Sequence, residues 1–140
     1  MAQLLIIIAA LPFLLFGLGH GAITLRDLRH PRAFTPPDAT LRQAMQQSSI
    51  RFRPDINLWQ AWLGFNLTHS LGLIVFGSVF LHFGIFDPGI FTSSLLVQAF
   101  AVAVSAAYLV TSIKYFFVHP VIGSAIGLVC FLAAAGLAHT

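Results

Sequence analysis

Residues 59–72 read Trp59-Gln-Ala-Trp62-Leu-Gly-Phe-Asn66-Leu-Thr68-His69-Ser70-Leu-Gly72, an apolar run interrupted by polar side chains. The surrounding segment is apolar enough to cross a membrane, yet an amide, two hydroxyls and an imidazole fall within residues 66–70. Polar groups are costly in hydrocarbon, so in membrane proteins they face other protein and often mark a site. This stretch therefore predicts a membrane helix with one polar face.

The composition of the whole chain agrees with a membrane environment. Of its 140 residues, 58% are hydrophobic and 8% are charged, whereas soluble domains carry about 25% charged residues. A chain this short has too little interior to hide such a sequence from water. It has no Glu and four Asp, all outside the apolar segments, which therefore hold no carboxylate pair of the glycosidase or di-iron kind. The few basic residues cluster beside membrane segments and do not indicate nucleic-acid binding.

Four segments reach the length of about 20 apolar residues that a helix needs to cross the hydrocarbon core. We expect them to form an all-α, four-span transmembrane helical bundle, a single domain over residues 1–140. The spans are expected at residues 3–25, 57–82, 91–113 and 120–138. The first is not interpreted as a signal peptide, because it has no basic residue before it and no small-residue cleavage site after it.

Charged residues predict the orientation of the four spans. Cytoplasmic connections of membrane proteins carry an excess of Lys and Arg. Lys114 lies between the last two spans, and all the arginines lie between the first two: Arg26, Arg29, Arg32, Arg42, Arg51 and Arg53. These two connections lie on the same side of a four-span protein, so we expect loop 26–56 in the cytoplasm and both termini outside.

Polar residues at the ends of the expected helices can accept hydrogen bonds from the free backbone donors of a first turn. Asp38 is expected to cap a short helix within loop 26–56, and Asp55 to cap the second span. Thr92 and Ser93 can cap the third. The short helix is expected to lie on the cytoplasmic surface, with one apolar face made by Leu41, Ala44, Met45 and Phe52.

Small residues recur at intervals of four in every span. Such stripes let helix backbones approach closely, which matters in lipid because no hydrophobic force drives helices together there. We expect the stripes to pack within the molecule rather than to form a dimer. They are Gly17/Gly21, Gly64/Thr68/Gly72, Ala99/Ala103/Ala107 and Gly123/Gly127.

Two histidines are expected to face each other from antiparallel neighbouring spans. His20 lies six residues before the first loop arginine, and His69 lies seven residues after Trp62. At 1.5 Å per residue, both lie about 10 Å below the headgroup level that these flanking residues mark. Asn66 and Ser70 are spaced to share a helix face with His69. The candidate cofactor-binding residues are therefore His20, Asn66, His69 and Ser70.

Three interpretations of this group stay open. The side chains can hydrogen-bond between helices and fix their register. The His pair can instead hold a haem iron, a chlorophyll magnesium or a transition metal. It can also relay protons, because imidazole titrates near neutral pH. No third metal ligand or defined cofactor motif accompanies the pair, which favours the first interpretation.

The order of these features resembles a family of small, functionally uncharacterised bacterial four-helix integral membrane proteins. The resemblance rests on Gly17-x-Gly19-His20, on Trp62-x-Gly64-Phe65-Asn66-x-x-His69-Ser70-x-Gly72 and on Tyr115-Phe116-Phe117-x-x-Pro120. It covers most of the chain in layout. It implies a four-span fold in a bacterial membrane and no known activity.

We expect an inner-membrane protein that acts as a non-catalytic accessory or structural subunit, with membrane lipids and other membrane protein subunits as partners. The first alternative is a protein that binds a tetrapyrrole, haem or chlorophyll, or another ligand through His20 and His69. The second is a small enzyme that acts on a lipid with His69 and Asn66. We expect no catalytic site, no dedicated metal site and no nucleic-acid partner.

Overall fold

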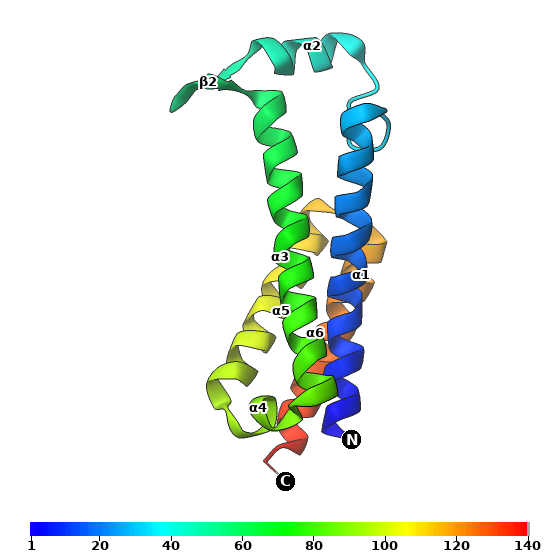
Figure 1. The fold of residues 1–140 in the computed structure, drawn as a ribbon, viewed down its shortest axis with the longest axis vertical. Helices are drawn as coiled ribbons and strands as arrows, with labels where there is room; N and C mark the ends of the chain where they lie inside the picture. The colour runs from blue at the N-terminus through cyan, green and yellow to red at the C-terminus, as the bar shows by residue number, and fades with distance from the viewer. Residues whose placement is uncertain (140) are drawn as a thin grey trace. The chain divides into compact units, whose positions relative to one another are not determined.

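A computed structural model describes residues 1–139 and is mainly helical (Figure 1). In chain order, its elements are α1 (Ala2–Arg29), α2 (Ala39–Gln47), β1 (Ser49–Ile50), β2 (Arg53–Asn57), α3 (Leu58–Phe86), α4 (Pro88–Ser93), α5 (Leu95–Tyr115) and α6 (Val118–Leu137). Helices α1, α3, α5 and α6 are each long and apolar enough to cross a membrane. The all-α, four-span fold class is therefore confirmed, and α1 and α3 each continue about four residues past the expected span.

The chain divides into two compact units, each described by itself. The first unit comprises Met1–Phe16 and the chain from Leu73 onward, and the second unit is Gly17–Gly72. Helices α1 and α3 each contribute one part to either unit. The first unit holds the apolar core, and the second holds the predicted polar residues.

Phenylalanine rings form the core of the first unit. The ring centroids of Phe13 and Phe76, on α1 and α3, lie 4.9 Å apart, as do those of Phe80 on α3 and Phe131 on α6. Both pairs meet edge to face, an arrangement that the ring quadrupole favours. Because lipid gives no hydrophobic drive for helix association, such specific packing is what holds these segments together.

Glycines allow the helices of the first unit to approach closely. A Cβ atom at Gly77 of α3 would lie 2.5 Å from the backbone nitrogen of Leu14 on α1. On α6, Gly123 and Gly127 lie against the rings of Phe16 and Phe13. The expectation that the Gly123/Gly127 stripe packs within the molecule is confirmed.

Ser94 fixes the start of α5. The side chain of Ser94 accepts a hydrogen bond from the backbone nitrogen of Val97 and caps the helix. The expected caps, Thr92 and Ser93, lie instead in the short helix α4, where both hydroxyls donate to the carbonyl of Gly89. The prediction of these two caps was wrong, because Pro88 starts an additional helical turn that ends before Ser94.

The second unit begins with the end of α1 and continues into α2. Asp38 accepts a hydrogen bond from the backbone nitrogen of Thr40 at 2.8 Å, which confirms the predicted cap of the short helix. The following strands, β1 and β2, form an antiparallel pair that the sequence analysis did not predict. Phe52 lies in the turn between them and is 87% exposed, so its placement on the apolar face of α2 was wrong.

Helix α3 is capped by Asn57 and not by Asp55. The Asn57 side chain accepts from the Gln60 backbone nitrogen at 2.8 Å, and the Gln60 side chain accepts from the Asn57 nitrogen at 3.0 Å. This reciprocal capping box satisfies two donors of the first turn. Asp55 pairs with Arg53 at 2.7 Å, and that guanidinium holds the pKa of Asp55 below its ordinary value.

Candidate functional site

His20 and Asn66 join α1 and α3 in the second unit. The His20 Nε2 atom lies 2.9 Å from Asn66 Oδ1, so the imidazole donates to the amide oxygen. The Asn66 amide nitrogen in turn donates to the carbonyl of Trp62 at 2.7 Å. Asn66 is 4% exposed. Both ends of its amide are thus engaged, which fixes the side chain and the ring that it holds.

His69 and Ser70 complete the group. The ring of His69 meets that of His20 edge to face, with centroids 5.2 Å apart. The Ser70 hydroxyl donates to the carbonyl of Asn66 at 2.9 Å, and Gly21 of α1 lies against the Ser70 side chain. The four residues predicted from the sequence therefore lie together. We call His20, Asn66, His69 and Ser70 the polar cluster.

The loop after α1 closes over the polar cluster through Asp27, a residue that the sequence analysis did not select. The Asp27 carboxylate is 2% exposed. It accepts hydrogen bonds from the backbone nitrogens of Ala33 and Phe34 at 3.1 and 2.6 Å, and from the Thr35 hydroxyl at 3.3 Å. These bonds fold residues 33–35 back onto the end of α1.

Phe34 connects this folded loop to the polar cluster. Its ring lies 4.4 Å from that of His20, centroid to centroid. Its carbonyl accepts a hydrogen bond from the indole nitrogen of Trp62 at 3.0 Å. Trp62, which the sequence analysis took to mark the headgroup level, thus ties the loop to α3. The loop is therefore attached to both helices next to His20.

The arrangement does not fit a tetrapyrrole held between His20 and His69. Two imidazoles that ligate one haem iron approach it from opposite faces of the macrocycle, with each nitrogen about 2 Å from the metal. Here the two rings touch each other, and His20 directs Nε2 at Asn66. Binding of another ligand by the polar cluster stays a prediction.

The polar cluster is expected to stabilise the contact between the parts of α1 and α3 in the second unit. A double-mutant cycle with His20→Ala and Asn66→Ala should give a coupling energy of about 0.6 kcal/mol, the average for hydrogen bonds between membrane helices, and at most about 1.7 kcal/mol. Unfolding of the purified protein by denaturing detergent measures it. Thr68→Ala is the control, because this hydroxyl donates to its own helix. Additive effects of the two alanine variants would contradict the assignment.

No protein-family model, curated protein or solved structure matches this chain.

Proposed function

We propose that this small membrane protein is a non-catalytic accessory subunit of the bacterial inner membrane, which packs against other membrane proteins within the bilayer. The observation that carries the proposal is a stripe of small residues on α5 that faces away from the molecule. The placement of loop 26–56 in the cytoplasm is part of the proposal and rests on its arginines.

Ala99, Ala103 and Ala107 are all exposed on α5, although we expected them to pack within the molecule. The opposite face of the same helix is buried through Gln98, Ala101, Ser105 and Ser112. Small side chains add little contact with lipid, but they let a second helix approach the backbone closely. The exposed stripe is therefore suited to a helix of another membrane protein.

A second outward stripe lies on the part of α3 in the second unit. Gly64, Thr68 and Gly72 are exposed, and a Cβ atom built at Gly64 would meet nothing within 4 Å. This differs from Gly123 and Gly127 of α6, whose space Phe16 and Phe13 fill. The Gly123/Gly127 stripe is thus filled, whereas the Gly64/Thr68/Gly72 stripe is open, contrary to the expectation that it packs within the molecule. An open stripe suits a partner helix.

The polar cluster supports a non-catalytic function. The amide of Asn66 and the hydroxyl of Ser70 are both engaged in hydrogen bonds within the unit. Catalysis on a lipid by His69 and Asn66 would require Asn66 to give up bonds that hold α1 to α3. We therefore favour a structural role for these side chains.

Ala103→Leu is expected to reduce recovery of the partner protein at least about tenfold, which corresponds to about 1.4 kcal/mol. The larger side chain would hold the partner helix away from α5. The measurement is quantitative mass spectrometry of proteins that co-purify from membranes in mild detergent.

Ala133→Leu is the matched control for this experiment, because Ala133 is also an exposed alanine but lies on α6. It should retain the partner at the level of the unchanged protein. Isolation of the unchanged protein as a lone monomer would contradict the proposal, and so would equal recovery with both variants.

A further inference from the structure

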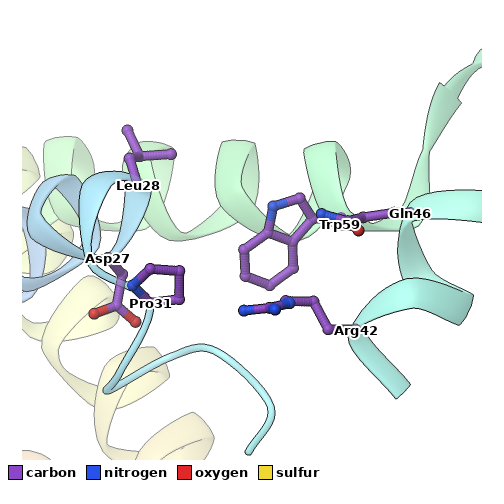
Figure 2. A pocket seen from close by; sticks show the side chains of 6 residues that line it. All are labelled: Asp27, Leu28, Pro31, Arg42, Gln46 and Trp59. Carbon is purple, nitrogen blue, oxygen red and sulfur yellow. The ribbon is translucent and has the colours of Figure 1, made fainter. Parts of the chain in front are cut away.

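A pocket of about 330 Å³ lies within the second unit, outside the polar cluster. The end of α1, the loop behind it, α2 and the start of α3 supply its walls, which consist of Asp27, Leu28, Pro31, Arg42, Gln46 and Trp59 (Figure 2). Its volume falls within the range of sites that bind small molecules. The pocket has no part in the proposed packing against partner helices.

Three solvent-accessible side-chain donors line this pocket, and they donate to no other residue within residues 1–139. They are the guanidinium of Arg42, the amide of Gln46 and the indole nitrogen of Trp59. Figure 2 shows the guanidinium reaching beneath the Trp59 ring on the side of Pro31. Arg53, by contrast, is held by Asp55. A ligand with several acceptor oxygens and a negative charge suits this set of donors.

The pocket also has a wall that carries two apolar side chains. Leu28, in the last turn of α1, and Pro31 stand opposite Arg42 and Gln46 (Figure 2). The Asp27 carboxylate belongs to the same wall, but its oxygens accept hydrogen bonds from residues 33–35. With the Asp27 oxygens occupied in this way, a guanidinium that faces Leu28 and Pro31 suits an amphiphile better than a free anion.

The position of the pocket along the chain indicates that such a ligand is a component of the membrane. Helix α1 ends at Arg29 and α3 begins at Leu58, and both are long and apolar enough to span a membrane. The pocket therefore lies where the chain leaves the hydrocarbon. Tryptophan is enriched at this level, and lipid phosphates lie there. Arginine suits phosphate because its planar fork donates two parallel hydrogen bonds.

We propose that this pocket binds the phosphodiester group of a membrane phospholipid. Arg42 pairs with the phosphate oxygens, and Gln46 and Trp59 donate further hydrogen bonds. The glycerol and the first carbons of the acyl chains lie against Leu28 and Pro31. The site would fix one lipid molecule beside the loop that covers the polar cluster.

The test measures binding of dioleoylphosphatidylethanolamine to the purified full chain in detergent by native mass spectrometry. This lipid has no net charge, so general attraction to the basic loop contributes little. Arg42→Gln should weaken binding about tenfold. Trp59→Phe keeps the ring but removes one donor, and it should weaken binding less.

Arg51→Gln is the matched control, because it removes the same charge from an exposed position in the turn between β1 and β2. Its affinity should stay within about twofold of the unchanged protein, less than a 0.5 kcal/mol change. If the Arg42→Gln variant bound dioleoylphosphatidylethanolamine as tightly as the unchanged protein, the proposal would be overturned. Equal binding of dioleoylglycerol, which lacks the phosphate, would overturn it as well. Binding of millimolar inorganic phosphate without any binding of the lipid would show a site for a free anion and reject the lipid.

Discussion

Gly77→Ala is expected to destabilise the first unit by about 3 kcal/mol, the upper end for adding a methyl group to a packed interior. The new Cβ atom would lie 2.5 Å from the backbone nitrogen of Leu14 and 2.9 Å from its Cα atom. A side chain could rotate away, but backbone atoms can move only if α1 and α3 separate. Unfolding of the purified protein by denaturing detergent measures the loss.

Gly136→Ala is the matched control for this substitution. Gly136 lies on α6, and a Cβ atom there would meet nothing within 4 Å. Because alanine favours a helix over glycine by up to about 1 kcal/mol, this variant should be neutral or slightly stabilised. If Gly77→Ala proved as stable as Gly136→Ala, the close contact between Gly77 and Leu14 would be refuted.

Asp27→Ala is expected to release residues 33–35 from the end of α1. The substitution removes the acceptor of three hydrogen bonds and leaves the backbone nitrogens of Ala33 and Phe34 without it. Loss of hydrogen bonds to a charged, shielded acceptor costs about 1.5–3 kcal/mol. Opening of this loop should become roughly hundredfold more frequent, which corresponds to about 2.8 kcal/mol. Amide hydrogen exchange at Ala33 and Phe34 measures it.

Asp38→Ala provides the comparison for Asp27. Asp38 is exposed and bonds to Thr40 at the start of α2, so its loss should raise exchange in α2 and leave residues 33–35 unchanged. Unchanged exchange at Phe34 in the Asp27→Ala protein would show that this carboxylate does not hold the loop.

The long apolar runs made the four spans predictable, because hydrocarbon thickness sets the length of a spanning helix. The approach of His20 to His69, whose ring centroids lie 5.2 Å apart, was predictable for a similar reason. Antiparallel helices with a common boundary bring residues of equal depth together, and 1.5 Å per residue converts sequence position into depth.

Other features depend on information that these patterns do not carry. Asp27 bonds to backbone nitrogens six and seven residues further along, and no residue type marks such partners. The capping box of α3 could have been predicted from the sequence, because Asn57 and Gln60 stand three residues apart at the start of an apolar run. The sequence analysis instead selected Asp55. The strand pair could not be predicted, because Pro54 and three charged residues within residues 49–57 break the pattern of apolar residues that is typical of strands.

The sequence also could not predict that the Ala99/Ala103/Ala107 stripe faces outward. Small residues at intervals of four favour close helix contact, but the interval does not tell whether the contact is within the molecule. Burial decides it: the three alanines are exposed, whereas Ala101 and Ser105 of the same helix are buried.

Photo-crosslinking in native membranes tests the proposed subunit function most directly. A photoreactive phenylalanine analogue can replace Phe100, which is 55% exposed and lies three residues from Ala103 on α5. Illumination should produce an adduct of this 15.2 kDa chain with a different membrane protein. The same analogue at the exposed Leu132 of α6 should give no such adduct. Crosslinks from position 100 to lipid alone would contradict the proposal that α5 packs against a partner.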